Sequence, residues 1–276
     1  MARDRGERER NRGGRVEFDP RLMASICGMG GWGKTKFACS APGPIEFLAT
    51  DPNSAETVSV EQAAQPDKDI RYHQFDLPGI AFGGREDVQE DAEAVWGQFV
   101  DVIRPIVKGE VEAPATIVLD TATEFWELLL LADHGRTFQI LPDLRTKTNA
   151  RYKSLLAGLK QTGAHVLLLH RLGPRYESRT VRSKQGPVEE RVQVPGEYDR
   201  QGFSKTEFSI NAEVHLAYNR ELDEDVLANQ FGMKVVRCTG RPLLIGREVW
   251  GTNSKGESKV TFDRLFRMVY PDANQD

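Results

Sequence analysis

The feature that most constrains this chain is a short glycine-rich segment near the N-terminus. Residues 28–35, Gly-Met-Gly-Gly-Trp-Gly-Lys-Thr, match the phosphate-binding pattern G-x-x-x-x-G-K-[ST] at every defined position. Such a loop turns backbone N–H groups inward around phosphate oxygens and works between a strand and a helix. The apolar run 22–27 before it is typical of a buried strand, and residues 36–39 continue as helix. The segment therefore predicts an α/β fold and a nucleoside triphosphate ligand.

The pattern also predicts a role for individual residues of the loop. Lys34 would bring positive charge to the β- and γ-phosphates, and the Thr35 hydroxyl would help to hold Mg²⁺. Trp32 has no defined role in the pattern and could stack on the nucleotide or on a neighbouring subunit. We therefore predict ATP and Mg²⁺ as cofactors. The predicted nucleotide-binding residues are Gly28, Met29, Gly30, Gly31, Trp32, Gly33, Lys34, Thr35 and Lys36.

Length and composition describe an ordinary soluble protein with one main domain. The chain has 276 residues, of which 39% are hydrophobic and 28% charged. It has no apolar stretch of the ~20 residues that a membrane span needs, and its N-terminus lacks the apolar core of a secretion signal. Its three cysteines have no metal-ligand spacing, which favours reduced thiols in the cytoplasm. We expect a disordered basic tail at 1–20, an ATPase domain at 21–270 and a short tail at 271–276.

The order of patterns along the chain predicts a mostly parallel sheet with helices on both faces. Further strands are expected at 45–50, 70–75, 115–120 and 164–170, and helices at 86–107, after 120 and before 163. Residues 171–206 are polar and rich in Gly, Pro and Arg, so we expect a long basic loop there. Beyond it, strands at 207–218, 231–238 and 243–249 suit antiparallel additions to the sheet edge, before a short helix at 260–268.

Acids and a histidine follow the predicted parallel strands and are the candidates for metal binding and catalysis. Asp120 ends an apolar run, the Walker B arrangement in which a carboxylate meets Mg²⁺, although it could instead cap the next helix. For the general base, Asp51 is favoured over Glu124, but Asp51 could be a turn-former and Glu124 a helix N-terminal acid. His170 is a candidate γ-phosphate sensor, or alternatively a structural residue at a strand end.

The segment after His170 is basic in a chain whose net charge is −4. Its Arg and Lys side chains would contact the phosphates of single-stranded DNA, while Tyr176 and Phe203 could stack on bases. A solvated surface loop is an equally open interpretation. Small-molecule kinases use an Arg-rich lid in the same way, and a nucleotide-binding partner protein with little hydrolysis is a third alternative. The candidate DNA-binding residues are Arg171, Arg175, Tyr176, Arg179, Arg182 and Lys184.

Taken together, these motifs resemble the RecA-like ATPases, and most of all the small single-domain versions that bacteriophages encode beside single-strand annealing recombinases. Residues 47–51, Phe-Leu-Ala-Thr-Asp, resemble the family's second strand, whose last acid activates water. Residues 117–121 resemble its Walker B strand, and residues 168–171 the start of its second DNA-binding loop. Residues 234–237, Lys-Val-Val-Arg, resemble the segment that offers basic groups to a neighbouring subunit's nucleotide, which makes Arg237 and Arg241 candidate trans-acting residues.

The resemblance implies a RecA-like P-loop fold and a DNA-stimulated ATPase in the host cytoplasm that assists phage recombination. It also implies a homo-oligomer and an annealing or single-strand-binding protein as partner. Two departures stand out. Asp51 is shorter than the Glu common at that position, and the acidic stretch 86–112 offers no basic surface for DNA.

Overall fold

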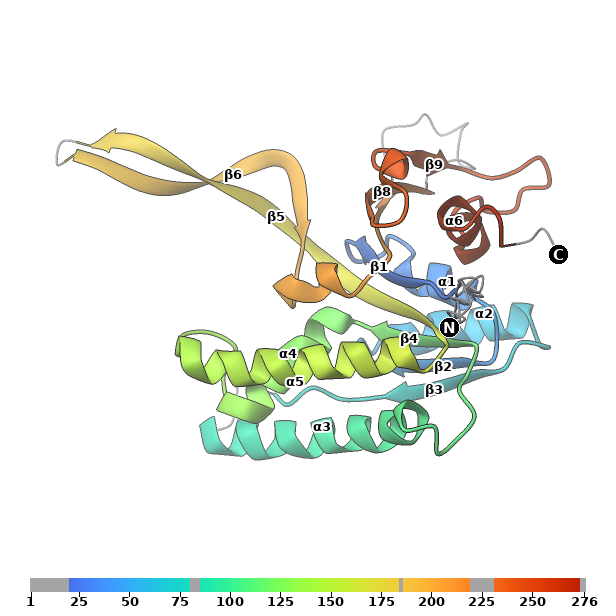
Figure 1. The fold of residues 1–276 in the computed structure, drawn as a ribbon, viewed down its shortest axis with the longest axis horizontal. Coiled ribbons are helices and arrows are strands. Elements are labelled where there is room, and N and C mark those ends of the chain that lie inside the picture. Colours follow the sequence, from blue (N-terminus) through green and yellow to red (C-terminus); the bar gives the residue numbers. More distant parts are fainter. Residues whose placement is uncertain (1–19, 80–84, 184–185, 219–230, 274–276) are drawn as a thin grey trace, which may run out of the picture.

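The computed structural model describes residues 20–79, 85–183, 186–218 and 231–273. Their central feature is a sheet with the strand order β3-β2-β4-β5-β1-β7-β8-β9, and β6 pairs with β5 beside this path (Figure 1). The strands are β1 Met23–Gly28, β2 Ile45–Ala49, β3 Ile70–Gln74, β4 Thr116–Asp120, β5 His165–Ser183, β6 Gly186–Arg200, β7 Ala212–Tyr218, β8 Phe231–Cys238 and β9 Glu248–Trp250. From β3 across to β7 all neighbours pair in parallel, whereas β8 and β9 are antiparallel.

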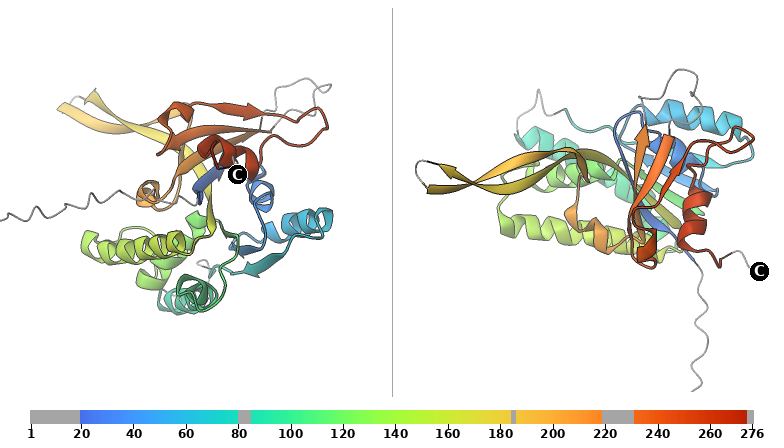
Figure 2. Two further views of the ribbon diagram at one scale, coloured as in Figure 1. Left: turned by 45° about the vertical axis from the view of Figure 1, so that its right-hand side comes forward. Right: turned by 90° about the horizontal axis from the view of Figure 1, so that it is seen from above.

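Helices cover both faces of the sheet, as Figures 1 and 2 show. One face carries α3 (Arg85–Val107), α4 (Ala122–His134) and α5 (Pro142–Gln161), and the other carries α1 (Lys34–Cys39), α2 (Ser54–Ala64) and α6 (Phe262–Val269). The predicted architecture is confirmed: this is an α/β fold whose mostly parallel central sheet has helices on both faces and antiparallel strands on the C-terminal side. No described helix is both long and apolar enough to cross a membrane.

The strand pattern places the sequence motifs at one edge. β1, β2 and β4 are buried along their whole length, which is why they read as unbroken apolar runs in the sequence. Because their carboxyl ends meet at the same edge of the sheet, the phosphate loop, Asp51 and Asp120 gather there. Thr50 and Asp51 follow β2 directly, and the Thr50 N–H donates to the Asp120 carbonyl oxygen at 2.6 Å.

The segment 171–206, which we expected to be a long loop, is instead largely a β-hairpin. β5 runs on beyond the parallel sheet and pairs antiparallel with β6 from Leu172↔Arg200 to Ser183↔Gly186. The hairpin extends away from the body of the protein in Figures 1 and 2, and we call residues 172–200 the arm. Both of its faces are polar, so the alternation of apolar and polar residues that signals a strand is missing from the sequence.

Other boundaries also differ from the sequence-based expectation. Residues 204–208 form a 3-10 helix, so that β7 begins at Ala212 rather than Glu207. Residues 242–244 form another 3-10 turn. Of the expected strand 243–249, only Glu248 and Val249 belong to β9, which continues to Trp250 and pairs with β8. Pro242 explains part of the second difference, because it has no N–H group to donate to a neighbouring strand.

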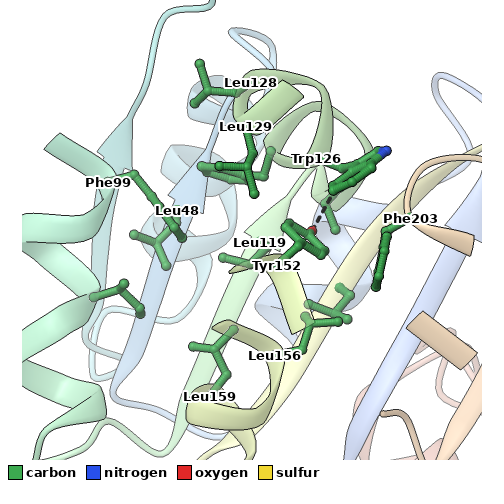
Figure 3. Packing of buried hydrophobic residues seen from close by; sticks show 14 of the residues in the cluster. Leu48, Phe99, Leu119, Trp126, Leu128, Leu129, Tyr152, Leu156, Leu159 and Phe203 are labelled. Carbon is green, nitrogen blue, oxygen red and sulfur yellow. Dashed lines mark hydrogen bonds between the residues drawn. The ribbon is translucent and has the colours of Figure 1, made fainter. Parts of the chain in front are cut away.

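The core on the α3–α5 face contains an aromatic cluster that includes Phe203 (Figure 3). The Phe203 ring lies 4.9 Å from that of Trp126 and 5.2 Å from that of Tyr152, and Phe203 is only 2% exposed. The Tyr152 hydroxyl is satisfied by the Ala122 carbonyl oxygen at 3.1 Å. The suggestion that Phe203 stacks on DNA bases is therefore wrong, because this ring anchors the end of the arm to α4 and α5.

Candidate functional site

The phosphate loop connects β1 to α1 with the backbone conformation that its glycines allow. Gly31 and Gly33 have φ of 75° and 79°, a left-handed region in which other L-residues are strained. Gly28 leaves room for its neighbours: a Cβ there would lie 3.3 Å from Lys34 Cγ, a tight contact, and 3.5 Å from Trp32 Cβ. The predicted nucleotide-binding residues 28–35 thus form one loop, whereas Lys36 is exposed and pairs with Glu61 at 3.3 Å.

The Lys34 side chain lies along the inside of this loop. Its Nζ donates to the carbonyl oxygens of Gly28 and Met29, both at 3.0 Å. Burial lowers the Lys34 pKa, and the nearby carboxylates of Asp120 and Asp51 oppose that shift. The lysine and both acids therefore share one electrostatic environment, as a triphosphate site requires.

Thr35 and Asp120, the predicted metal-binding pair, are in direct contact. The Thr35 hydroxyl donates to Asp120 Oδ2 at 2.9 Å, and the Ser54 hydroxyl donates to the same oxygen at 2.6 Å. Asp120 is 1% exposed, and burial raises its pKa while the two hydroxyls oppose the rise. A carboxylate and a hydroxyl at this distance are hard oxygen donors of the kind that Mg²⁺ prefers, so the residues fit this ion. Ser54 was missed in the sequence because a serine at a helix start usually caps the helix.

The two acids considered as general base lie in different surroundings. Asp51 is partly exposed, and its Oδ1 accepts from the backbone and side-chain N–H groups of Asn53, both at 3.0 Å. Among the described residues, its Oδ2 has no hydrogen-bond partner. Asp51 thus has one oxygen in a turn and one available to a reactant.

Glu124, in contrast, is held by both oxygens. Oε2 accepts from the Thr50 hydroxyl at 2.7 Å and from the Thr121 hydroxyl at 3.3 Å, and Oε1 is paired with the Arg171 guanidinium. Glu124 is 6% exposed and lies in the first turn of α4, where the helix dipole favours its charge. This geometry gives Glu124 the features of a positioning residue that connects β2, α4 and the start of the arm.

His170 lies in β5 beside β1 and is almost fully buried. Its Nδ1 is 3.0 Å from the Leu168 carbonyl oxygen and 2.9 Å from the Ser25 hydroxyl. Because a carbonyl oxygen only accepts, Nδ1 carries the proton and Nε2 is left as an acceptor. Burial lowers the His170 pKa to about 3, and the charge of Arg200 contributes to the shift. The imidazole is therefore neutral near pH 7, and a sensor role would rest on hydrogen bonding rather than on charge.

The candidate DNA-binding residues are less available than the sequence suggested, because β6 places acids beside them. Arg171 is paired with Glu124, and its backbone N–H donates to the Thr123 hydroxyl at 3.1 Å. Arg175 contacts Glu197 at 2.7 Å and Glu177 at 3.2 Å.

Farther along the arm, Arg179 stands opposite Glu190 in the strand register. Tyr176 is 48% exposed, with the Arg191 guanidinium 5.5 Å from its ring centroid. Arg182 pairs opposite Pro187 in the backbone ladder, and Lys184 lies outside the described residues.

The candidate trans-acting residues lie on the β8 side of the sheet. Arg237 forms an ion pair with Glu207 at 2.5 Å, and Arg241 donates to the Met268 carbonyl oxygen at 2.9 Å. Both side chains have partners within the chain, so an approach to another subunit's nucleotide would require them to change partners.

Next to the phosphate loop lies a cavity of about 420 Å³, within the range of ligand pockets. Trp32 and Gly33 line it from the loop, Gln65 from the end of α2, Phe231 from β8 and Val260 from the segment before α6. Trp32 thus has a structural setting: it lines a cavity beside the phosphate loop, together with the aromatic side chains of Phe37 and Phe231. A planar heteroaromatic ring attached to a bound triphosphate would fit such a cavity.

Comparison with known proteins does not assign a family or a function to this chain. No protein-family model matches the chain, and no curated protein matches it. Among solved structures, a KaiC-like protein of the hyperthermophilic archaeon Pyrococcus horikoshii is similar, with a TM-score of 0.38 and 13% sequence identity over 79% of each chain. The functional argument below therefore rests on the residues of this chain.

Proposed function

We propose that this chain binds ATP with Mg²⁺ and hydrolyses it at the carboxyl edge of the sheet. The observation that carries the proposal is the meeting of three motifs there: the phosphate loop with Lys34, the Thr35–Asp120 pair, and Asp51 with one oxygen available. The loop and Lys34 would hold the phosphates, and the cavity beside Trp32 would take the base. Bound Mg²⁺ would neutralise charge on the phosphates.

The roles of the remaining residues follow from their positions. Asp51 would orient and deprotonate the attacking water, because its Oδ2 lies at the edge where the Lys34 charge is felt. Ser54 would position the Asp120 carboxylate through their 2.6 Å hydrogen bond. His170 would offer Nε2 as a neutral acceptor near the end of β1.

The test is nucleotide-dependent stabilisation together with ATP turnover. Mg²⁺-ATP at about 100 times its Kd should stabilise the wild type by about 2.7 kcal/mol. Lys34→Ala should lose both this stabilisation and turnover, while Lys108→Ala, an exposed lysine at the end of α3, should keep both. A wild type without nucleotide stabilisation, or a Lys34→Ala variant with normal turnover, would contradict the proposal. Turnover without any phosphate acceptor also separates an ATPase from a small-molecule kinase.

A single-stranded DNA partner is the finer part of the proposal, and the arm is its candidate surface. In favour, the arm starts beside the nucleotide edge, and Tyr176 is exposed on it. The returning strand brings acids that reduce the positive charge. The basic residues of 171–200 are Arg171, Arg175, Arg179, Arg182, Lys184, Arg191 and Arg200; the acidic ones are Glu177, Glu189, Glu190, Glu197 and Asp199.

Salt dependence tests the DNA proposal directly. If the five basic residues from Arg171 to Lys184 contact phosphates, log K should fall with log salt at a slope of about −3 to −4. A slope near zero, or unchanged binding when Arg175, Arg179 and Arg182 are replaced by Ala, would exclude the arm. A role in phage recombination, an annealing or single-strand-binding partner, a homo-oligomer and the trans action of Arg237 and Arg241 stay predictions from the family resemblance.

A further inference from the structure

A second group of metal-ligand side chains lies beside the phosphate loop and is not used by the proposed ATP site. It comes from β1 and β7, which are parallel neighbours with Cys27 opposite His215 and Ser25 opposite Glu213. Residues two apart in a strand share a face, so Glu213 and His215 point to the same side of the sheet. The Cys27 sulfur, a Glu213 oxygen and a His215 ring nitrogen all lie within 4.8 Å of one another. No other such trio of His, Cys, Asp or Glu occurs among the described residues.

The distances are close to those of a tetrahedral site. Two ligands bound about 2.0–2.1 Å from zinc at the tetrahedral angle lie about 3.3 Å apart. His215 Nε2 and Glu213 Oε1 are 3.3 Å apart. A sulfur bound at about 2.3 Å would lie about 3.6 Å from either of these atoms. The Cys27 side chain would therefore move by about 1.2 Å at most from the observed limit of 4.8 Å.

The surroundings hold the carboxylate in place and leave one side open. Arg200 Nε lies 3.3 Å from Glu213 Oε2, so it fixes the oxygen that does not face His215, as outer-shell partners of metal ligands do. Cys27 is fully buried, whereas the His215 side chain is 20% exposed and gives access from solvent.

We propose that Cys27, Glu213 and His215 bind a divalent cation of the zinc class, with water in the fourth position. Sulfur and imidazole donors favour Zn²⁺ over Mg²⁺, whose all-oxygen preference is met at Thr35 and Asp120 instead. Binding releases the Cys27 thiol proton to solvent as the metal–sulfur bond forms. Because Cys27 directly precedes Gly28, the bound ion connects the start of the phosphate loop to β7. The inference does not depend on ATP hydrolysis.

Cobalt titration of the full-length, chelator-treated protein without nucleotide is the decisive experiment. Wild type should bind one Co²⁺ with a near-ultraviolet thiolate-to-cobalt charge-transfer band, and Zn²⁺ should displace it. Cys27→Ser should abolish the band. His215→Gln keeps the sulfur and should weaken binding by more than about tenfold, the minimum seen when even an outer-shell partner is removed. Cys238→Ser, which alters a buried cysteine outside the trio, is the matched control and should titrate like wild type.

Several outcomes would overturn the site. A wild type that shows no thiolate band at micromolar Co²⁺ rules it out, and so does a band that survives Cys27→Ser. Circular dichroism and the melting temperature identify a variant that fails to fold. If Cys27→Ser is unfolded, the partly exposed His215 still decides the matter, because a folded His215→Gln variant with wild-type affinity contradicts the coordination.

Discussion

The contrast between Asp51 and Glu124 yields the sharpest prediction about the proposed reaction. Glu124→Gln keeps the size of the side chain and removes its charge. The glutamine carbonyl can still accept from the Thr50 hydroxyl, now 2.7 Å from Glu124 Oε2, but its amide group would face the Arg171 guanidinium and repel it. The expected effect is therefore the loss of one ion pair, with little change in packing.

The magnitude follows from the exposure of the two partners. A hydrogen bond to a charged group contributes about 1.5–3 kcal/mol when buried. The Glu124 side chain is 8% exposed, but the Arg171 side chain is 49% exposed and can return to water, so screening reduces the figure to about 1–2 kcal/mol. For a domain of this size, that loss lowers the melting temperature by about 2–8 °C. The rate constant kcat should change by less than about tenfold, since no proton transfer is removed.

Asp51→Asn should show the opposite behaviour. Its carboxamide oxygen can still accept from Asn53, so stability should change little, whereas loss of a general base should reduce kcat by about 10²–10⁴-fold. Phosphate release at saturating Mg²⁺-ATP and thermal denaturation of both variants make the comparison. A Glu124→Gln variant with normal stability and a hundredfold lower kcat, beside an active Asp51→Asn variant, would refute the assignment.

Three further predictions concern the buried histidine, the arm anchor and the loop. The His170 pKa of about 3 lies below the ordinary 6.5, so its contribution to stability is present above pH 6.5 and is lost as pH falls toward 3. Between pH 6 and pH 5, the free energy of unfolding measured in urea should therefore fall by up to about 1.4 kcal/mol more in wild type than in His170→Gln. Equal decreases in the two proteins would contradict this prediction. Phe203→Ala removes a ring packed on Trp126 and should cost about 3–5 kcal/mol in chemical denaturation; unchanged stability with weaker DNA binding would restore the stacking interpretation. Gly33→Ala forces a non-glycine residue to φ 79° and should cost about 1–2 kcal/mol and weaken nucleotide binding, while Gly30→Ala, with no atom within 4 Å, should be tolerated in a thermal-shift assay.

Much of the fold and the site edge could be predicted because the signals are local. Strands buried on both faces, such as β1 and β4, appear as apolar runs, and the bounds of β8 match the predicted strand 231–238. The phosphate loop then fixes which strand is β1, and parallel pairing brings the residues after β2 and β4 to the same edge. The Thr35–Asp120 contact follows from this logic although the two residues are 85 positions apart.

The arm could not be predicted, because its strand pairs join residues distant in sequence and most of its described side chains are exposed on both faces. Glycine and proline at 173–174 and 195–196 indicate turns, yet the two strands pair on both sides of a register shift that leaves Arg175 and residues 194–197 outside the ladder. The positive charge expected for residues 171–185 was overestimated for a related reason. Counting charges along residues 171–185 omits the acids that β6 brings back across the hairpin, where Glu197 meets Arg175 and Glu190 stands opposite Arg179.

Two arginines, one directly before the arm and one at its last residue, form ion pairs with acids distant in sequence, and these pairs limit what the arginines can bind. Arg171, directly before the arm, has in the sequence the features of a phosphate ligand, but it forms an ion pair with Glu124 beside the Walker B strand. Arg200, at the second end, is tied to Glu213 on β7 and is 9% exposed. A nucleic acid that drew Arg171 onto its phosphates would have to break the pair with Glu124, leaving a buried carboxylate without its cation. Loss of this ion pair, about 1–2 kcal/mol, would offset much of the gain from one screened phosphate contact, so Arg171 should contribute less to DNA binding than the basic residues beyond it.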